Sequence, residues 1–118
     1  MADYRNLEVW KSGKALAVAV YRLASSLPDE ERFGLRSQIQ RAAVSIPANL
    51  AEGAGRGGDE EFGRFVRIAI GSLNELDTLL QIASELGQAI VPDDVIDHIR
   101  DLAVRLRNLE AKLSSSSN

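Results

Sequence analysis

The single histidine of this chain is its most obvious candidate for catalysis or metal binding. His98 shares a predicted helix with Asp94, Asp97 and Asp101, and a carboxylate four residues away can contact an imidazole on one helix face. A carboxylate-bridged metal site in a helical bundle takes Glu-x-x-His pairs from two helices, which one histidine cannot supply. These side chains also lie mostly off the apolar seam of the helix, which favours a solvated charged face. The sequence therefore predicts no metal and no other cofactor.

Two other motifs resemble catalytic elements but lack the full pattern. The glycine-rich GAGRGG at residues 53–58 follows a predicted helix rather than a strand, and it lacks the Gly-Lys-Ser/Thr ending of a phosphate-binding loop. Asp59, Glu60 and Glu61 open the next predicted helix and would repel a phosphate from its N-terminus. Ser45 has no base within one helical turn to activate it as a nucleophile. The sequence therefore predicts that this protein is not an enzyme.

A stripe of hydrogen-bonding side chains runs along the predicted helix that contains residues 38–56. At about 100° per residue these side chains fall within an arc of about 80°, beside an apolar arc that faces the core. We predict that the stripe forms an interhelical hydrogen-bond network, which fixes the register of a bundle. A ligand-binding or nucleic-acid-binding surface is the alternative. The predicted network comprises Arg41, Ser45, Asn49 and Glu52, together with Ser72 and Glu75 from the following helix.

Basic side chains are unevenly distributed in this acidic chain. The net charge is −3, yet residues 1–58 carry eight Lys or Arg against six Asp or Glu. A local basic patch can contact nucleic-acid phosphates, although the chain lacks the strong basic excess of typical nucleic-acid-binding proteins. Solvated or intramolecular ion pairs are the alternative use of these arginines. The candidate nucleic-acid-binding residues are Arg32, Arg36, Arg56 and Arg64.

Length and composition predict one domain over residues 1–113 and a disordered tail over residues 114–118. The chain has no cysteine, which suits a reducing cytoplasm. Its first ten residues lack the basic and apolar regions of a secretion signal. The longest apolar run, Ala15 to Tyr21, is too short to cross a bilayer. We therefore expect a cytoplasmic protein that does not enter the membrane.

Apolar periodicity predicts four helices with short connections. The expected helices cover residues 7–26 with Asn6 as N-cap, 33–53 with a kink at Pro47, 59–86 with Gly87 as the stop, and 92–113. No segment shows the sustained alternation that a strand needs. The pattern predicts an all-α fold, an antiparallel up-and-down four-helix bundle.

The third predicted helix carries more apolar surface than one bundle can bury. Two apolar seams run along it side by side and cover an arc of about 200°, whereas a surface helix needs about 100°. The second seam therefore predicts contact with another copy of the chain. The residues predicted at this oligomer interface are Ile68, Leu79, Ile82 and Leu86.

Three segments of the chain are long and specific enough to indicate a family. They are LEVWKSGKALA from Leu7, LPDEERFGLRSQIQRAAVSIPANLAEGAGR from Leu27, and EFGRFVRIAIGSLNEL from Glu61. In these segments the chain resembles the bacterial family of four-helix bundle proteins encoded in intervening sequences of 23S ribosomal RNA genes. The resemblance covers residues 7–86, and the last predicted helix matches in pattern only.

This resemblance implies a compact bundle that associates into a homopentamer. The best understood relatives are accessory proteins of diversity-generating retroelements, which work beside a reverse transcriptase and bind nucleic acid through a basic surface. This chain departs from those relatives in being acidic overall. The resemblance places no catalytic residue. The matching motif residues are Arg41, Ser45, Pro47, Asn49, Glu52, Gly53, Arg56, Ser72 and Glu75.

Two functional interpretations are open at this level. The first is a non-enzymatic, oligomeric scaffold or accessory protein that engages RNA or DNA through a basic surface. The second is a protein–protein interaction module with no nucleic-acid binding. The expected partners are other copies of the chain, RNA or DNA under the first interpretation, and a reverse transcriptase or another protein.

Overall fold

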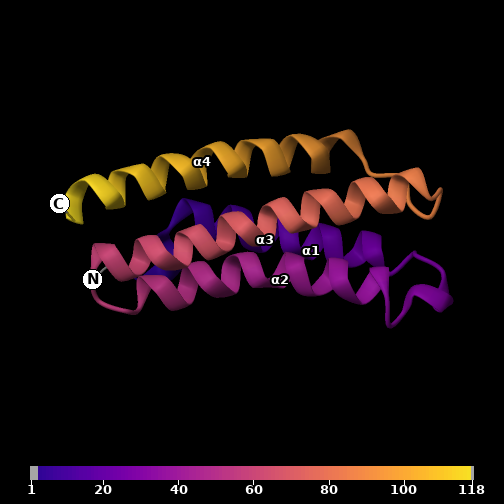
Figure 1. Cartoon of the computed structure of the whole chain (residues 1–118), viewed down its shortest axis with the longest axis horizontal. Helices are drawn as coiled ribbons and strands as arrows, with labels where there is room; N and C mark the ends of the chain where they lie inside the picture. The colour runs from indigo at the N-terminus through magenta and orange to yellow at the C-terminus, as the bar shows by residue number, and fades with distance from the viewer. Residues whose placement is uncertain (1–2, 118) are drawn as a thin grey trace.

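The computed structural model describes residues 3–117, which form four long helices and no strand. The long helices are α1 (Glu8–Ala24), α2 (Leu35–Ala54), α3 (Asp59–Glu85) and α4 (Asp93–Ser117), with short 3-10 helices η1 (Tyr4–Asn6) and η2 (Asp29–Glu31) before α1 and α2. The chain runs up and down between the two ends of an elongated molecule of 47 × 22 × 20 Å (Figure 1). The predicted all-α four-helix bundle is confirmed. None of the helices in residues 3–117 is long and apolar enough to span a membrane.

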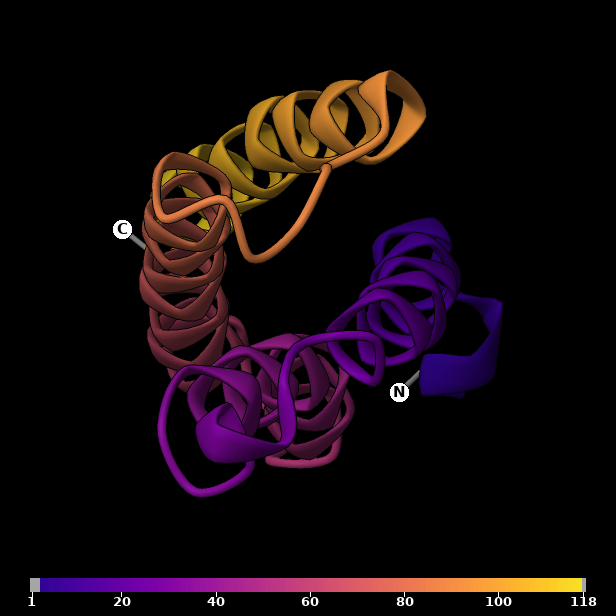
Figure 2. The same cartoon turned by 90° about the vertical axis from the view of Figure 1, so that its right-hand side faces the viewer.

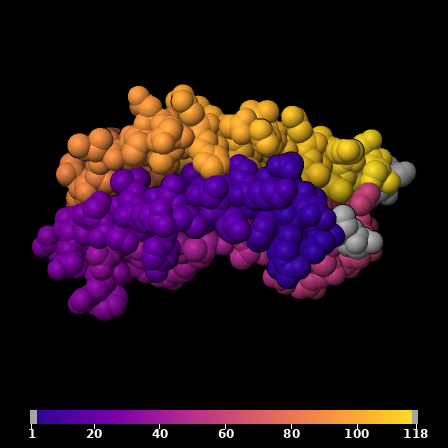
Figure 3. Space-filling model, turned by 180° about the vertical axis from the view of Figure 1, so that it is seen from behind, coloured from indigo at the N-terminus to yellow at the C-terminus, as the bar shows by residue number. Residues whose placement is uncertain are grey.

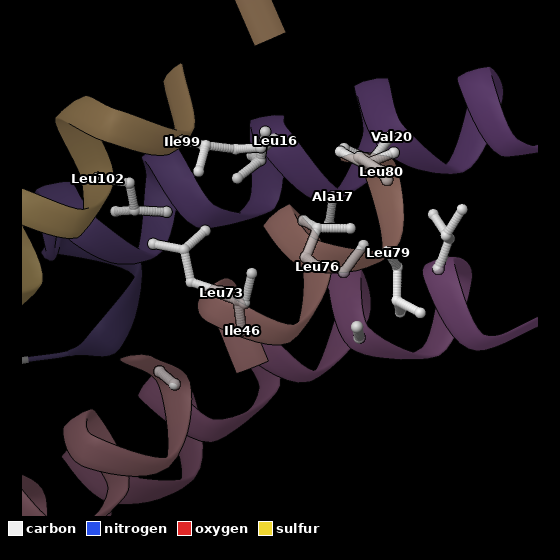
Figure 4. Close-up of a cluster of buried hydrophobic side chains, with 14 of the residues drawn as sticks. Leu16, Ala17, Val20, Ile46, Leu73, Leu76, Leu79, Leu80, Ile99 and Leu102 are labelled. Atoms are coloured by element: carbon white, nitrogen blue, oxygen red, sulfur yellow. The ribbon is translucent and has the colours of Figure 1, made fainter. Parts of the chain in front are cut away.

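The core contains apolar side chains from all four long helices. Leu16, Ile46, Leu73 and Leu102, one from each helix, are fully buried and lie together in the interior (Figure 4). Seen end-on, the helices occupy the corners of the bundle, with α2 between α1 and α3 (Figure 2). The α2–α3 contact is the most extensive, and the α1–α4 contact, visible along the side shown in Figure 3, is the least. The hairpin of α2 and α3 is therefore the most firmly packed part of the fold.

A glycine allows α1 to approach α2 at the proline of that helix. α2 continues as one helix through Pro47. A Cβ atom built on Gly13 of α1 would lie 3.8 Å from Pro47 Cβ and 3.3 Å from Ile46 Cγ2. The hydrogen of glycine leaves room for this approach, which a larger side chain would oppose.

The start of α2 is held by one carboxylate. Glu31 accepts a hydrogen bond from the Leu35 backbone N–H (3.1 Å) and another from the Gln88 side-chain amide (3.0 Å). The Gln88 bond, followed by the Leu35 bond, holds the pKa of Glu31 below its ordinary value. Because Gln88 lies between α3 and α4, Glu31 links the start of α2 to that connection.

Gly87 ends α3, as the sequence predicts. Its φ of 70° lies in the left-handed region, which glycine adopts without strain. The Gln88 N–H donates to the Ala83 carbonyl (2.9 Å), and the Gly87 N–H donates to the Ser84 carbonyl (3.0 Å). These two bonds satisfy carbonyls that the helix end would otherwise leave unpaired.

Both ends of the bundle differ from the sequence prediction. Leu7, not Asn6, occupies the N-cap position of α1, because Tyr4–Asn6 form η1. α4 continues through Ser117, four residues beyond the predicted end of the last helix and into the segment predicted as a disordered tail. The Ser116 hydroxyl donates to the Asp59 carboxylate at the start of α3, and this contact helps to hold the last turn. Residue 118 lies outside the described residues.

Candidate functional site

Three of the six predicted network residues are joined across the α2–α3 contact. Ser45 Oγ and Ser72 Oγ lie 2.8 Å apart. The Asn49 amide donates to Ser45 twice, to its carbonyl oxygen (2.8 Å) and to its hydroxyl oxygen (2.9 Å). Because Ser45 Oγ accepts a hydrogen bond from the Asn49 amide, its own O–H can donate a hydrogen bond to Ser72 Oγ. The hydrogen bonds therefore run from Asn49 through Ser45 to Ser72 and tie α2 to α3 in one register.

The other three predicted residues do not join these hydrogen bonds. Arg41 donates to Ser37 on its own helix (2.9 Å), and Glu52 pairs with Arg56 one turn later (2.6 Å). Glu75 is exposed and makes no hydrogen bond or ion pair with the residues that the structure describes. The network is therefore smaller than predicted, because these longer charged side chains extend along the surface instead of across the helix contact.

A shallow groove of about 250 Å³ opens beside these hydrogen bonds. Its lining combines one hydroxyl, one amide, one guanidinium and one carboxylate, and none of the lining residues is a histidine. The Ser45 hydroxyl is engaged by Asn49 and Ser72, so the groove offers its amide, guanidinium and carboxylate groups for polar contacts. The lining residues are Gln38, Arg41, Ala42, Ser45 and Glu75.

We expect Asn49→Ala to destabilise the fold by about 1 kcal/mol, because it removes two hydrogen bonds to Ser45 from a half-buried position. Glu52→Ala should change the free energy of unfolding by less than about 0.5 kcal/mol, since its ion pair with Arg56 is about half exposed to water. Urea unfolding of both variants at one protein concentration measures the two changes. Equal losses in the two variants would contradict this ranking.

An apolar stripe on the outer side of α3 stays exposed in the single bundle. Ile68, Ile82 and Leu86 are 40%, 43% and 61% exposed. Ser72 and Glu75 lie on the same line of the helix, at intervals of three and four residues from Ile68. We call Ile68, Ile82 and Leu86 the α3 stripe. Three of the four predicted interface residues are thus accessible to a partner.

Leu79, predicted at the same interface, is instead part of the core. It is 8% exposed and packs within the buried cluster of the bundle (Figure 4). Seven residues advance a helix by almost two full turns, so Leu79 points within about 20° of the direction of Ser72. Ser72 bonds to α2. Leu79 is therefore buried in the single bundle, on the side of α3 that faces α2, and it is not exposed as the other three predicted interface residues are.

The four candidate nucleic-acid-binding arginines lie near opposite ends of α2. Arg32 and Arg36 lie at its start, whereas Arg56 follows its end and Arg64 lies in the first turns of α3. α2 has 20 residues and is therefore about 30 Å long. The arginines therefore form two separate pairs instead of the single basic surface predicted from this segment. The rigid helix α2 holds Arg32 and Arg36 apart from Arg56 and Arg64.

Most of these arginines already have acidic partners. Arg56 and Arg64 also place their guanidinium groups over the ring of Phe65, at 5.1 and 4.5 Å from its centroid. The hydrogen bond from Arg64 lowers the pKa of Glu61. Arg56 and Arg64 thus form a clustered pair at one end of the bundle. The ion pairs are Arg36–Asp29 (3.9 Å), Arg56–Glu52 (2.6 Å) and Arg64–Glu61 (3.2 Å).

The histidine makes a contact that sequence reasoning missed. His98 Nε2 lies 2.9 Å from Ser12 Oγ, and this bond joins α4 to α1. Ser12 precedes the buried Gly13 in α1, but no feature of its local sequence distinguishes it from a surface serine. Among the described residues, no group of three or more His, Asp or Glu side chains is placed to hold a metal ion.

Comparison with known proteins extends the resemblance found in the three sequence segments. The family model described as 23S rRNA-intervening sequence protein matches residues 5–112. This match reaches into α4, where the sequence segments indicated only a similar pattern. A search of curated proteins finds no match. The matched range includes residues of all four long helices and the hydrogen bonds between Asn49, Ser45 and Ser72, and the chain therefore belongs to the 23S rRNA-intervening sequence protein family.

Proposed function

We propose that this protein is a non-enzymatic scaffold that assembles with copies of itself through the α3 stripe. The supporting observation is the exposure of three large aliphatic side chains along one line of one helix. Large apolar side chains left exposed on one helix face mark an interaction site, and a helix with a second apolar face buries it against another helix. The family resemblance supports a closed ring of five copies.

The side chains with the greatest potential for catalysis have structural bonds instead. Ser45 is engaged by Asn49 and Ser72, and His98 is engaged by Ser12 on another helix. No base contacts Ser45 among these partners, so its hydroxyl has no group to take its proton during nucleophilic attack. This arrangement supports a scaffold rather than an enzyme.

Light scattering coupled to gel filtration tests the proposed assembly. At micromolar concentration we expect one species of about five times the mass of a single chain. Ile82→Asp should lower the assembly state, because the interface would then bury a carboxylate without a partner. Asn74→Asp places the same charge on an exposed position of α3 away from the stripe and should leave the assembly unchanged. A monodisperse monomer of the wild-type protein would overturn the proposal.

Nucleic-acid binding is a second candidate function, supported by the Arg56–Arg64 pair. Both side chains are about half exposed and stack over one aromatic ring at one end of the bundle. Each also has an acidic partner, so one copy offers only a weak positive surface. A ring would repeat the pair in several copies and strengthen binding through multivalency. With aromatic residues making up 5% of the chain, contacts should go to phosphates and be indifferent to base sequence.

Salt dependence and charge reversal test this second function. Affinity for a structured RNA and for a DNA duplex should fall by orders of magnitude as salt rises from about 50 to about 200 mM. Arg56→Glu combined with Arg64→Glu should abolish binding, whereas Arg32→Glu combined with Arg36→Glu, at the other end of α2, should preserve it. Fluorescence anisotropy measures both. If the wild type does not bind at the lower salt, the protein interaction module without nucleic-acid binding is favoured.

A further inference from the structure

A second exposed apolar surface lies on the outer side of α1 and α2. Val18 and Tyr21 of α1 are 46% and 49% exposed, and Val44 of α2 is 45% exposed. We call these three residues the α1–α2 patch. Like the α3 stripe, the patch consists of large side chains that a single bundle leaves in water, although their burial would be favourable.

The rotation of each helix places the α1–α2 patch on the outside of the α1–α2 contact. On α1, Ser12 bonds to α4, and Tyr21 lies about 180° from Ser12 around the helix, with Val18 one turn before it. On α2, Pro47 faces α1, and Val44 lies about 60° from Pro47 on the side away from the core. The patch therefore belongs to the face formed by α1 and α2.

The α3 stripe lies on the neighbouring face, formed by α2 and α3. Ser72 bonds to α2, while Asp77 lines a hollow between α3 and α4. Ile68 and Leu86 lie about 40° from Ser72 and about 180° from Asp77 around the helix. The stripe is therefore turned toward the α2 side of α3 and away from α4. The two apolar surfaces are separated by α2, which lies between α1 and α3 (Figure 2).

This placement suits a closed ring. The cross-section of the bundle is roughly square, at 22 × 20 Å, so adjacent faces point about 90° apart. In a ring, one surface of each copy binds a different surface of the next copy. The directions in which these two surfaces point differ by about 90° in a ring of four copies and by about 108° in a ring of five. We infer that the α3 stripe of one copy docks onto the α1–α2 patch of the next, an inference that rests on the proposed self-assembly. α2 then faces the axis of the ring.

Area and charge support a second copy of this chain as the partner. One face of the bundle is about 47 Å long and 20 Å wide, which is enough for the roughly 800 Å² per partner that a stable interface buries. Glu75 lies between Ile68 and Ile82 on α3. Lys14 and Arg22 lie one turn before and one turn after Val18 on α1. Docking of the two faces would bring these opposite charges together, which favours the correct pairing.

Mixing two variants tests this pairing. Ile82→Asp disables the α3 stripe, and Val44→Asp disables the α1–α2 patch. Under conditions in which the wild type forms a ring, each variant alone should be a monomer, because either change disables one of the two surfaces that every contact needs. An equal mixture should form a one-to-one heterodimer, since one intact stripe can dock onto one intact patch and no further contact can follow. Light scattering and native mass spectrometry measure the masses.

Three controls make the outcome decisive. Tyr21→Asp provides a second patch variant, and circular dichroism verifies that each variant keeps its helical content. Val104→Asp, on an exposed position of α4, should still form the wild-type ring. If Val44→Asp and Tyr21→Asp assemble like the wild type, or if the mixture stays monomeric, the pairing is wrong while self-assembly stands. A monomeric wild type would overturn both proposals.

Discussion

Phe65→Ala is expected to destabilise the protein by about 3 to 5 kcal/mol, the usual cost of removing a buried phenylalanine ring. Phe65 is 6% exposed and lies in α3 near the turn from α2. Its loss would leave a cavity at the best packed contact of the bundle. It would also remove the ring on which Arg56 and Arg64 rest, so any nucleic-acid binding should weaken together with stability.

Phe33→Ala is the matched control for this prediction. Phe33 is 86% exposed, yet Arg32 lies over its ring at 4.8 Å, much as Arg64 lies over Phe65. The change should alter the free energy of unfolding by less than about 0.5 kcal/mol. Urea unfolding at one protein concentration compares the two variants, because the stability of an oligomer depends on concentration. Similar losses would mean that the cation–π contact, and not burial, governs the stability at both sites.

Gly53→Ala is expected to cost about 1 to 3 kcal/mol through overpacking. A Cβ atom built on Gly53 would lie 2.5 Å from Phe65 Cβ and 3.1 Å from Phe62 Cδ1. The nearer atom is fixed to the α3 backbone and cannot rotate away, so the two helices would have to separate. The glycine is thus required by the close approach of α2 and α3.

Gly63→Ala provides the contrast, because a Cβ atom there meets only ordinary contacts, 3.6 Å from Arg67 Nη1 and 3.8 Å from Leu113 Cβ. Alanine is the better helix former by about 1 kcal/mol, so this change should be neutral or stabilising. Both glycines lie inside helices, and the comparison therefore isolates the effect of space. A stabilised Gly53→Ala variant would show that α2 and α3 are farther apart than described.

The two proposals for function depend on the same hairpin. Tight packing at Gly53 and the hydrogen bonds from Asn49 through Ser45 to Ser72 hold α2 and α3 in one register. That register determines which side of α3 remains outside the bundle. The α3 stripe can act as a specific interface because its side chains stand on a rigid pair of helices, and flexible loops would pay a larger ordering cost on assembly.

Local sequence patterns were sufficient to predict the helices. A helix repeats about every 3.6 residues, so the spacing of apolar side chains shows which residues share a face without any knowledge of the partner helix. Gly87 could be predicted as the stop of α3 for a similar reason, since its left-handed conformation is a local property of the backbone. The end of α4 could not be predicted from local sequence, because the Ser116 hydroxyl donates to Asp59, which lies on another helix.

Leu79 and Ile82 show what periodicity leaves undecided. Both belong to the second apolar seam of α3, yet Leu79 is buried in the core and Ile82 is 43% exposed. The difference depends on how α3 is rotated against α2, which the packing of residues far apart in sequence decides. The bond between Ser12 and His98 depends in the same way on tertiary packing, because the two residues are 86 positions apart in the sequence. The apolar face of each helix follows from the local spacing of apolar residues. Which neighbouring helix covers that face is decided only when the whole core packs.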